Sequence, residues 1–400
     1  MNRTAGEIAA RIARESYGRL IAYLAARDRD VPAAEDALSD AFAAALQSWP
    51  AQGAPADPEG WLIVAAEQAL RLVAEELAEA EPHALPDRRL ALMFACVHPA
   101  IEAHVRAPLM LQTILGLDAA ATASASLVAP AAMGQRLARA KARIKLAGIP
   151  FRAPSPELWP ERIGAVLDAI YAAFSHGWLE TTDARARNLA EEAIWLGRVA
   201  ASLAPDEPEA GGLLALMLYA HARRAARRDS AGRFVPRSEQ DVGAWDHAAI
   251  DEAESRLAAA ARGCPGRFQL EAAIQSAHVA RRRDGTTDWP AVAALYDALL
   301  ALTGSPVVAV NRAVAISHVE RAVAGLCALR AIEAGDALAQ FQAYWAARAD
   351  LEARAGLASA GEAYARAIGL EADPATRAFL LQSLAAFEAR RLNPAARPAR

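Results

Sequence analysis

Hydrophobic residues recur at the spacing of amphipathic helices along almost the whole chain. Between residues 32 and 49 the apolar positions are Ala34, Ala37, Leu38, Ala41, Phe42, Ala45 and Leu46. Pro32 stands near the start of this segment, where a missing N–H costs least. The same spacing predicts helices over residues 8–25 and 61–80, separated by a break rich in Pro, Gly and Ala at residues 51–60. Because alanine and leucine dominate and strand-like alternation is rare, the sequence predicts an all-α protein.

Residues 117–146 have the pattern of a helix, a tight turn and a second helix. Asp118 can cap a short helix that ends at Leu127, residues 128–130 form the turn, and the second helix covers residues 131–146. This is the outline of a helix-turn-helix. The expected core face of the second helix consists of Met133, Leu137, Ala140 and Ile144.

Paired amphipathic helices are expected from residue 161 to the C-terminal region. Ala360, Tyr364 and Ala367 follow a small-Tyr-small packing pattern typical of tetratricopeptide repeats, and a second set echoes it at Val292, Tyr296 and Leu299. Stacked helix pairs of this kind form an α-solenoid with a concave surface that can hold a protein or small-molecule ligand.

Prolines and glycines divide the chain into four predicted parts. Residues 1–85 form a helical bundle, residues 86–150 a helix-turn-helix domain, residues 151–392 a helical-repeat domain, and residues 393–400 a disordered tail. A chain of 400 residues with 54% hydrophobic residues is long enough for these domains.

Composition narrows the function classes. The net charge of −4 gives no global basic field, so contact with nucleic acid requires a local patch. The three cysteines form no CxxC pair or disulfide framework, which suits a reducing compartment. The N-terminus has no apolar signal region, and no apolar run is long enough for a membrane span. We therefore expect a cytoplasmic protein with no membrane partner.

The strongest cationic patch lies on the second helix of the predicted helix-turn-helix. Residues 134–152 contain no acidic residue. Cations on the exposed flank of such a helix supply phosphate and base-edge contacts, so we predict DNA binding there; a solvated helix face is the alternative. The predicted DNA-binding residues are Arg136, Arg139, Lys141, Arg143 and Lys145.

Two other arginine clusters carry weaker signals. Arg223, Arg224, Arg227 and Arg228 have acidic residues upstream and downstream, so intramolecular ion pairs are the expected interpretation. Residues 281–283 are three consecutive arginines before an aspartate and are expected in a loop.

The sequence gives little indication of catalysis or metal binding. Cys96, His98 and His104 are the nearest candidate metal ligands, but no matching pair of ligands follows downstream. Nucleotide-binding, nucleophile-elbow and zinc-protease motifs are absent from the sequence. We predict no enzyme, no metal and no cofactor, and an enzyme with a pocket in the repeat region remains a distant alternative.

Several segments resemble extracytoplasmic-function sigma factors, in the subgroup with a tetratricopeptide-like extension. AEDALSDAFAAALQSWP (34–50) and DPEGWL (57–62) are similar to the core-binding part of sigma region 2, and QRLARAKARIKLAGIPF (135–151) to the recognition helix of region 4. PDEPEAGGLLALMLYAHARRAAR (205–227), TDWPAVAALYDALLAL (287–302) and SPVVAVNRAVAI (305–316) resemble the C-terminal extension. The resemblance covers nearly the whole chain.

This resemblance implies a promoter-specificity subunit regulated by its helical-repeat tail. Its partners would be the RNA polymerase core and promoter DNA. The helix at 34–49 would dock on the polymerase, which gives the predicted polymerase-binding residues Glu35, Asp36, Ser39, Asp40 and Phe42.

The chain departs from the family pattern where region 2 should hold melted DNA. The helix there is acidic, with a lone Arg71, whereas holding single-stranded DNA requires cations and stacking. In region 4, Pro108 interrupts an expected helix. A degenerate sigma-like protein that binds proteins or ligands but no longer melts promoters is therefore the alternative function. The acidic residues of the helix in region 2, which would repel DNA, are Glu67, Glu75, Glu76, Glu79 and Glu81.

Overall fold

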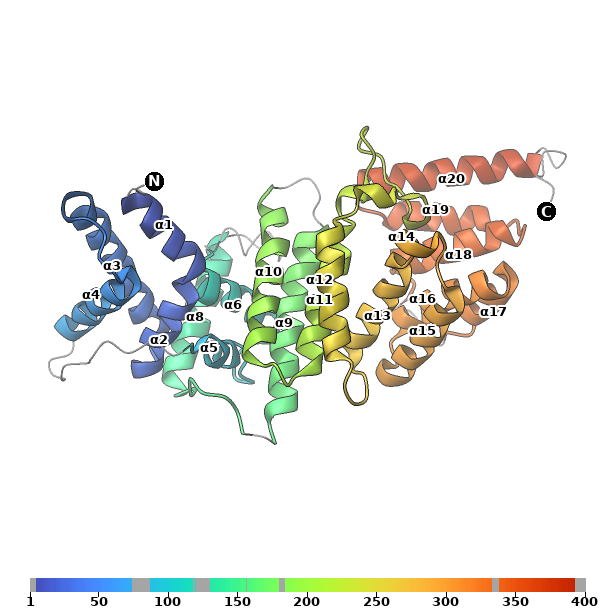
Figure 1. The fold of residues 1–400 in the computed structure, drawn as a ribbon. Helices are drawn as coiled ribbons and strands as arrows, with labels where there is room; N and C mark the ends of the chain where they lie inside the picture. The colour runs from blue at the N-terminus through green and yellow to red at the C-terminus, as the bar shows by residue number, and fades with distance from the viewer. Residues whose placement is uncertain are drawn as a thin grey trace. The chain divides into compact units, whose positions relative to one another are not determined.

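A computed structural model describes residues 5–73, 87–117, 119, 130–155, 157–179, 184–332 and 338–392. Within these ranges the chain consists of helices, connected by turns and loops with a single isolated β-bridge, which confirms the all-α prediction. None of the described helices combines the length and apolarity that crossing a membrane requires. The chain divides into two compact units, residues 1–204 and 205–400 (Figure 1). The predicted boundaries at residues 85 and 150 do not coincide with this division.

The first unit contains helices from the N-terminus to residue 203. α6 packs against α2, α8 and α9, so the segments predicted as separate bundles share contacts. The helices are α1 (Ala5–Glu15), α2 (Tyr17–Asp28), α3 (Val31–Gln52), α4 (Pro58–Val73), α5 (Arg89–Cys96), α6 (Ala103–Leu115), α8 (Pro130–Leu146), α9 (Trp159–Leu179) and α10 (Ala184–Leu203).

The ends of α3 follow from local chemistry. The Asp30 carboxylate accepts a hydrogen bond from the Ala33 N–H at 3.2 Å, and Gly53 ends the helix with a φ of 83°. Leu38 is fully buried as expected, but Leu46 is 52% exposed, so its place in the predicted core face is wrong. The buried stripe instead continues to Trp49, whose ring packs edge-on against Trp61 of α4 at 5.4 Å.

The helix predicted over residues 8–25 is interrupted at Ser16, so that part of the prediction is wrong. Ser16 leaves helical geometry, with a φ of −123°, and its hydroxyl donates a hydrogen bond to Glu59 Oε1 at 2.6 Å. Arg19 forms an ion pair with the same Glu59 side chain. The glutamate of α4 thus fixes the junction between α1 and α2.

A glycine allows α2 and α6 to approach closely. A Cβ on Gly18 would overlap the Ile114 carbonyl oxygen and lie 2.8 Å from Ile114 Cγ2. Pro108 lies inside α6 and is buried, yet the helix continues to Leu115. The predicted interruption at Pro108 therefore does not end this helix.

We expect Gly18→Ala to lower the free energy of unfolding by about 1 to 3 kcal/mol, because the methyl group forces α2 away from the α6 backbone. Gly164→Ala in α9 is the control, since a Cβ there meets no atom within 4 Å. Alanine's higher helix propensity should stabilise the control by up to about 1 kcal/mol. Urea denaturation measures the unfolding free energy of both variants. Equal changes in the two variants would contradict the close contact between α2 and α6.

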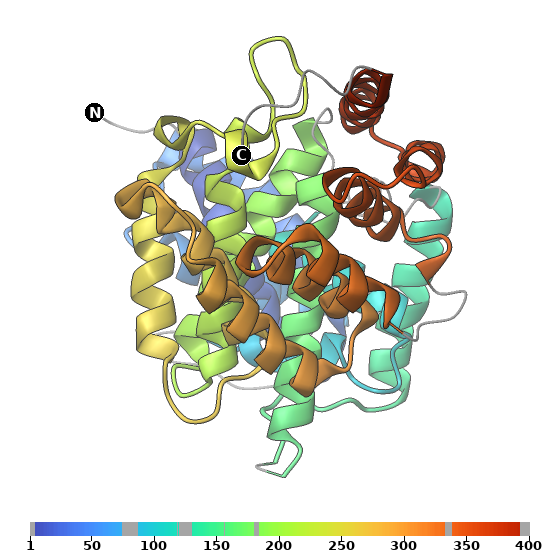
Figure 2. The same cartoon turned by 90° about the vertical axis from the view of Figure 1, so that its right-hand side faces the viewer.

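The second unit is a series of neighbouring helices. α11 packs against α12 and α13, and the later helices pack mainly on their neighbours in the chain, as the yellow to red ribbons show (Figure 2). Its helices are α11 (Pro208–Ala222), α12 (His247–Ala260), α13 (Arg267–Val279), α14 (Arg281–Asp284), α15 (Trp289–Thr303), α16 (Pro306–Val319), α17 (Ala322–Arg330), α18 (Gln342–Arg354), α19 (Ala360–Leu370) and α20 (Pro374–Leu392), with 3-10 turns η1 (Ala225–Arg227), η2 (Arg237–Glu239) and η3 (Val242–Ala244).

The positions of the repeat-like pattern are packing positions. Val292 and Leu299 of α15 are buried in one hydrophobic cluster, which Tyr296 flanks. In a second cluster, Tyr364 of α19 packs with Phe387 of α20 at a ring distance of 6.5 Å. The helical spacing in the sequence therefore identified residues that join neighbouring helices.

The start of α20 depends on Asp373. Its carboxylate accepts hydrogen bonds from the N–H and the hydroxyl of Thr376, and forms an ion pair with Arg228 at 2.7 Å. Burial opposes ionisation, but the bonds to Thr376 and Arg228 outweigh it and hold the pKa of Asp373 at about 2.

We expect Asp373→Ala to cost about 1 kcal/mol of unfolding free energy at pH 7, because a helix cap and an ion pair are lost. Because the folded-state pKa is depressed, this contribution is present above the unfolded value and is lost as pH falls from about 4 toward about 2. Urea denaturation at several pH values tests this. Asp373→Asn keeps a capping oxygen and should show a smaller loss. A difference in unfolding free energy between Asp373→Ala and the unmodified chain that stays constant as pH falls would contradict the assignment.

Candidate nucleic-acid interface

One side of α8 is anchored in the first unit. Met133, Leu137 and Ile144 are at most 1% exposed and Ala140 is 8% exposed, which confirms the predicted core face. α8 packs against α6 and α3. This anchoring orients the charged side chains on the rest of the helix.

A second side of α8 presents arginines to solvent. Arg139 and Arg143 are exposed and Arg136 is half-buried. Arg139 Nε donates to the carbonyl oxygen of Gln135 at 3.3 Å, which lies one turn earlier. Within the described ranges no carboxylate forms an ion pair with these three guanidinium groups. Three cations on one helix flank are thus available to an anionic partner.

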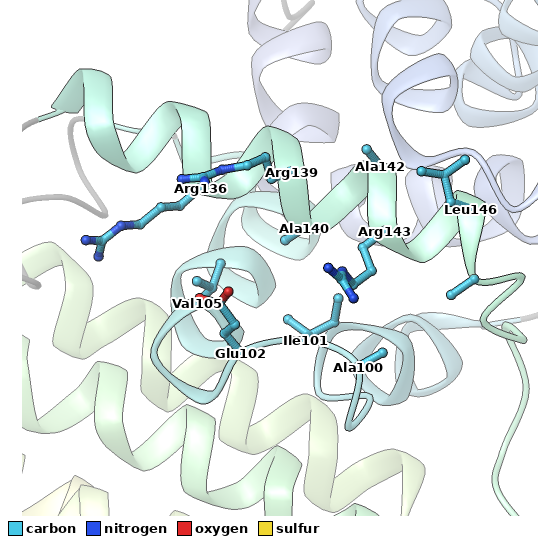
Figure 3. Close-up of a pocket in the computed structure, with 11 residues that line it drawn as sticks. Ala100, Ile101, Glu102, Val105, Arg136, Arg139, Ala140, Ala142, Arg143 and Leu146 are labelled. Atoms are coloured by element: carbon cyan, nitrogen blue, oxygen red, sulfur yellow. The ribbon is translucent and has the colours of Figure 1, made fainter.

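The arginine flank borders a cavity of about 630 Å³. Its opposite wall is the segment between α5 and α6, which contributes Ala100 and Ile101, and Arg143 extends from α8 toward it (Figure 3). Glu102 is the carboxylate among the lining residues, and it lies 3.3 Å from His104 Nε2. The cavity therefore joins an apolar floor to a cationic rim.

Lys141 faces α3 and not solvent. Its Nζ lies 2.5 Å and 2.8 Å from the two carboxylate oxygens of Glu35, and its side chain is 8% exposed. The residue directly follows the buried Ala140, so the helix turns it toward the α3 side. Lys141 is therefore directed at Glu35, unlike Arg139 and Arg143, which are exposed.

Lys145 and Asp30 form a second link between α8 and the start of α3. The Nζ to Oδ2 distance is 2.5 Å, and the lysine side chain remains 59% exposed. Lys145 therefore stays accessible to a partner, but it would have to share its charge with Asp30.

The predicted polymerase-binding residues on α3 differ in their exposure to solvent. Asp36, Ser39 and Asp40 are exposed, and the Ser39 hydroxyl donates to the Glu35 carbonyl oxygen at 2.8 Å. Phe42 is half-buried. The Glu35 side chain is 19% exposed and is held by Lys141, so it is covered while α8 stays in place.

The Glu35–Lys141 contact carries a desolvation cost. Burial raises the pKa of Glu35, and neighbouring Asp36 raises it further, against the opposing effect of the Lys141 hydrogen bond. A charge removed from water gains from its partner only what remains after desolvation. The pair therefore specifies how α8 sits on α3 more than it adds net stability.

Several predicted features lie outside the described residues. These are Glu75, Glu76, Glu79 and Glu81, the tail at 393–400, and nearly all of the first helix of the predicted helix-turn-helix at 118–127. Glu67 is described: its carboxylate lies 4.0 Å from the Arg27 guanidinium, and its side chain is 14% exposed.

Comparison with known proteins identifies relatives. Residues 162–261 match a family of unknown function, DUF6596. The uncharacterized protein R00370 of Rhizobium meliloti strain 1021 is 35% identical over 397 residues, which cover 92% of this chain and 92% of that protein. The chain belongs to the same protein family as R00370. No solved structure matches.

We expect Lys141→Met to lower the free energy of unfolding by about 2 to 4 kcal/mol, because it leaves the Glu35 carboxylate covered and unpaired. Adding Glu35→Leu should restore most of the loss. Lys145→Met, which breaks the exposed pair, should cost less than about 1 kcal/mol. Urea denaturation measures the unfolding free energy of the two single variants and the double variant. A double variant that is as unstable as Lys141→Met alone would contradict the assignment.

Proposed function

We propose that the chain is an extracytoplasmic-function type sigma factor that binds promoter DNA through α8 in the cell cytoplasm. The observation that carries the proposal is the exposed arginine flank of α8. It offers three guanidinium groups without carboxylate partners among the described residues, on a helix whose other side is anchored. Such a flank can neutralise phosphates and donate paired hydrogen bonds to guanine edges.

The proposal assigns roles to the rest of the chain. The exposed Asp36, Ser39 and Asp40 of α3 would meet the polymerase core, with Phe42 beside them. The second unit would be a tetratricopeptide-like tail, because its neighbouring helices pack through the predicted small and aromatic positions. The tail would regulate initiation without taking part in catalysis.

A second candidate function is a sigma-like regulator that no longer opens promoters. The Lys141–Glu35 and Lys145–Asp30 pairs favour it, since they hold the DNA-binding helix against the docking helix. Both partners of the first pair are largely covered. In this alternative the chain binds a protein or a ligand but does not initiate transcription.

We expect Arg139→Ala and Arg143→Ala each to weaken binding to promoter-length duplex DNA. Each should also reduce the slope of the logarithm of the binding constant against the logarithm of salt concentration by about one, which corresponds to the loss of one phosphate contact. Arg11→Ala in α1 is the control, since its guanidinium already pairs with Glu15. Fluorescence anisotropy across a series of salt concentrations measures both effects. Unchanged affinity in the α8 variants would refute the interface.

Transcription with purified core polymerase and a promoter library separates the two functions. Specific initiation that is lost in Arg139→Ala supports the sigma factor. Core binding without an open complex supports the regulator.

A further inference from the structure

The second unit contains a cavity whose wall is cationic and aromatic. Its volume is about 630 Å³, within the range of small-molecule sites. Residues from η2, α13, α14, α15 and α16 line it, so segments distant in the sequence converge there. The lining includes Arg237, His278, Arg281, Trp289, Tyr296 and His318, and it contains no carboxylate from the described residues.

Arg237 brings an unpaired positive charge to this cavity. Its side chain is exposed to solvent, and no carboxylate in the described part of the chain forms an ion pair with it. The surrounding protein and the charge of Arg281 lower the pKa of Arg237, while the phenol of Tyr296 acts in the opposite direction. Arg237 is therefore a solvent-accessible cation within a concave wall.

Arg281 is fixed by neutral groups. Its guanidinium donates to the carbonyl oxygens of Ser238 at 2.7 Å and Gln240 at 2.8 Å, which position the charge without neutralising it. Its neighbours differ: Arg282 pairs with Asp251 and Glu254, and Arg283 pairs with Glu254. The carboxylates Asp251 and Glu254 thus pair with arginines that are not among the residues lining the cavity.

A third arginine adds to the local charge. Arg223 is 6% exposed and donates to the side-chain oxygen of Gln275 at 2.5 Å. Burial, together with repulsion from Arg237 and Arg281, lowers its pKa to about 9.

His278 lies near the same charges. Its burial and the charges of Arg223, Arg237 and Arg281 hold the pKa of His278 at about 2, so this ring is neutral at pH 7. Mutually repelling cations of this kind cost free energy unless an anion compensates them.

Aromatic rings form the adjoining wall. Trp289 and His318 stack with ring centres 3.7 Å apart and an interplanar angle of 4°, and His278 meets Trp289 edge-on at 5.4 Å. Uncharged polar groups of Thr287 and Asn311 complete the lining. Flat apolar surface next to cations suits a molecule that has both a ring and an anionic group.

We propose that this cavity binds a small organic anion, in which a phosphate or carboxylate group meets Arg237 and the organic body packs against Trp289 and Tyr296. The site is independent of the proposed DNA interface, since every lining residue lies in the second unit. Sequence reasoning missed it because it assigned the arginines at 223–228 to ion pairs and those at 281–283 to a loop. Only the fold brings Arg223, Arg237 and Arg281 together.

Calorimetric titration of the full chain tests the proposal with three probes that share one ring: phenyl phosphate, benzoate and benzyl alcohol. We expect one or both anions to bind at millimolar concentration or below, while the neutral alcohol does not. Binding of phenyl phosphate alone identifies a phosphate site, and binding of benzoate alone identifies a carboxylate site. Absence of binding by both anions, or equal binding of the alcohol, would overturn the proposal.

Arg237→Ala should weaken anion binding by at least about tenfold, because the accessible charge is removed. Arg233→Ala is the matched control: this exposed arginine of the same segment pairs with Asp229, and its loss should leave affinity unchanged. Without ligand, the melting temperature of Arg237→Ala should equal or exceed that of the unmodified chain, since repulsion is relieved. Anion affinity that is the same in Arg237→Ala and the unmodified chain would also overturn the proposal.

Discussion

Close contact between helix backbones is the constraint on which both units depend. At three crossings a glycine faces a neighbouring backbone or side chain: Gly18 meets Ile114, a Cβ on Gly212 would lie 2.7 Å from the Gln269 nitrogen, and one on Gly325 would lie 2.6 Å from the Ala313 oxygen. Alanine side chains are too small to fill the space between two helices whose axes lie far apart. Alanine-rich helices can therefore bury their faces against each other only when they approach closely. The absence of a side chain at these glycines therefore allows the short distances between the helices.

Ion pairs join other segments of each unit. Long charged side chains can cover apolar surface with their stems while their charged ends reach a partner on another segment. In the first unit Lys141 reaches from α8 to Glu35 of α3, and Ser16 and Arg19 converge on Glu59 of α4. In the second unit Arg228 reaches Asp373 at the start of α20. Ion pairs thus define which flanks meet, while apolar contacts supply most of the stabilisation.

The sequence was sufficient for the features that depend on local periodicity. Met133, Leu137 and Ile144 could be assigned to a buried face because helical spacing alone decides which residues share a side. It was insufficient where a distant residue decides the outcome. The Ser16 break depends on Glu59, 43 residues away, and the covering of Lys141 depends on Glu35, 106 residues away. No pattern within either helix contains that information, because a lysine has the same helical position whether it faces solvent or a carboxylate.

The arginines illustrate how much the partner, and not the residue type, decides function. Arg282 and Arg281 are adjacent, yet one is neutralised by Asp251 and Glu254 while the other is held by backbone carbonyl oxygens. A guanidinium that is positioned but not neutralised keeps its attraction for an anion, and the fold bears the cost of its repulsion. The same logic applies to Arg139 and Arg143 on α8, where solvent reduces that cost. An exposed flank can therefore attract an extended polyanion, whereas a recessed cluster beside aromatic rings is better matched to a single small one.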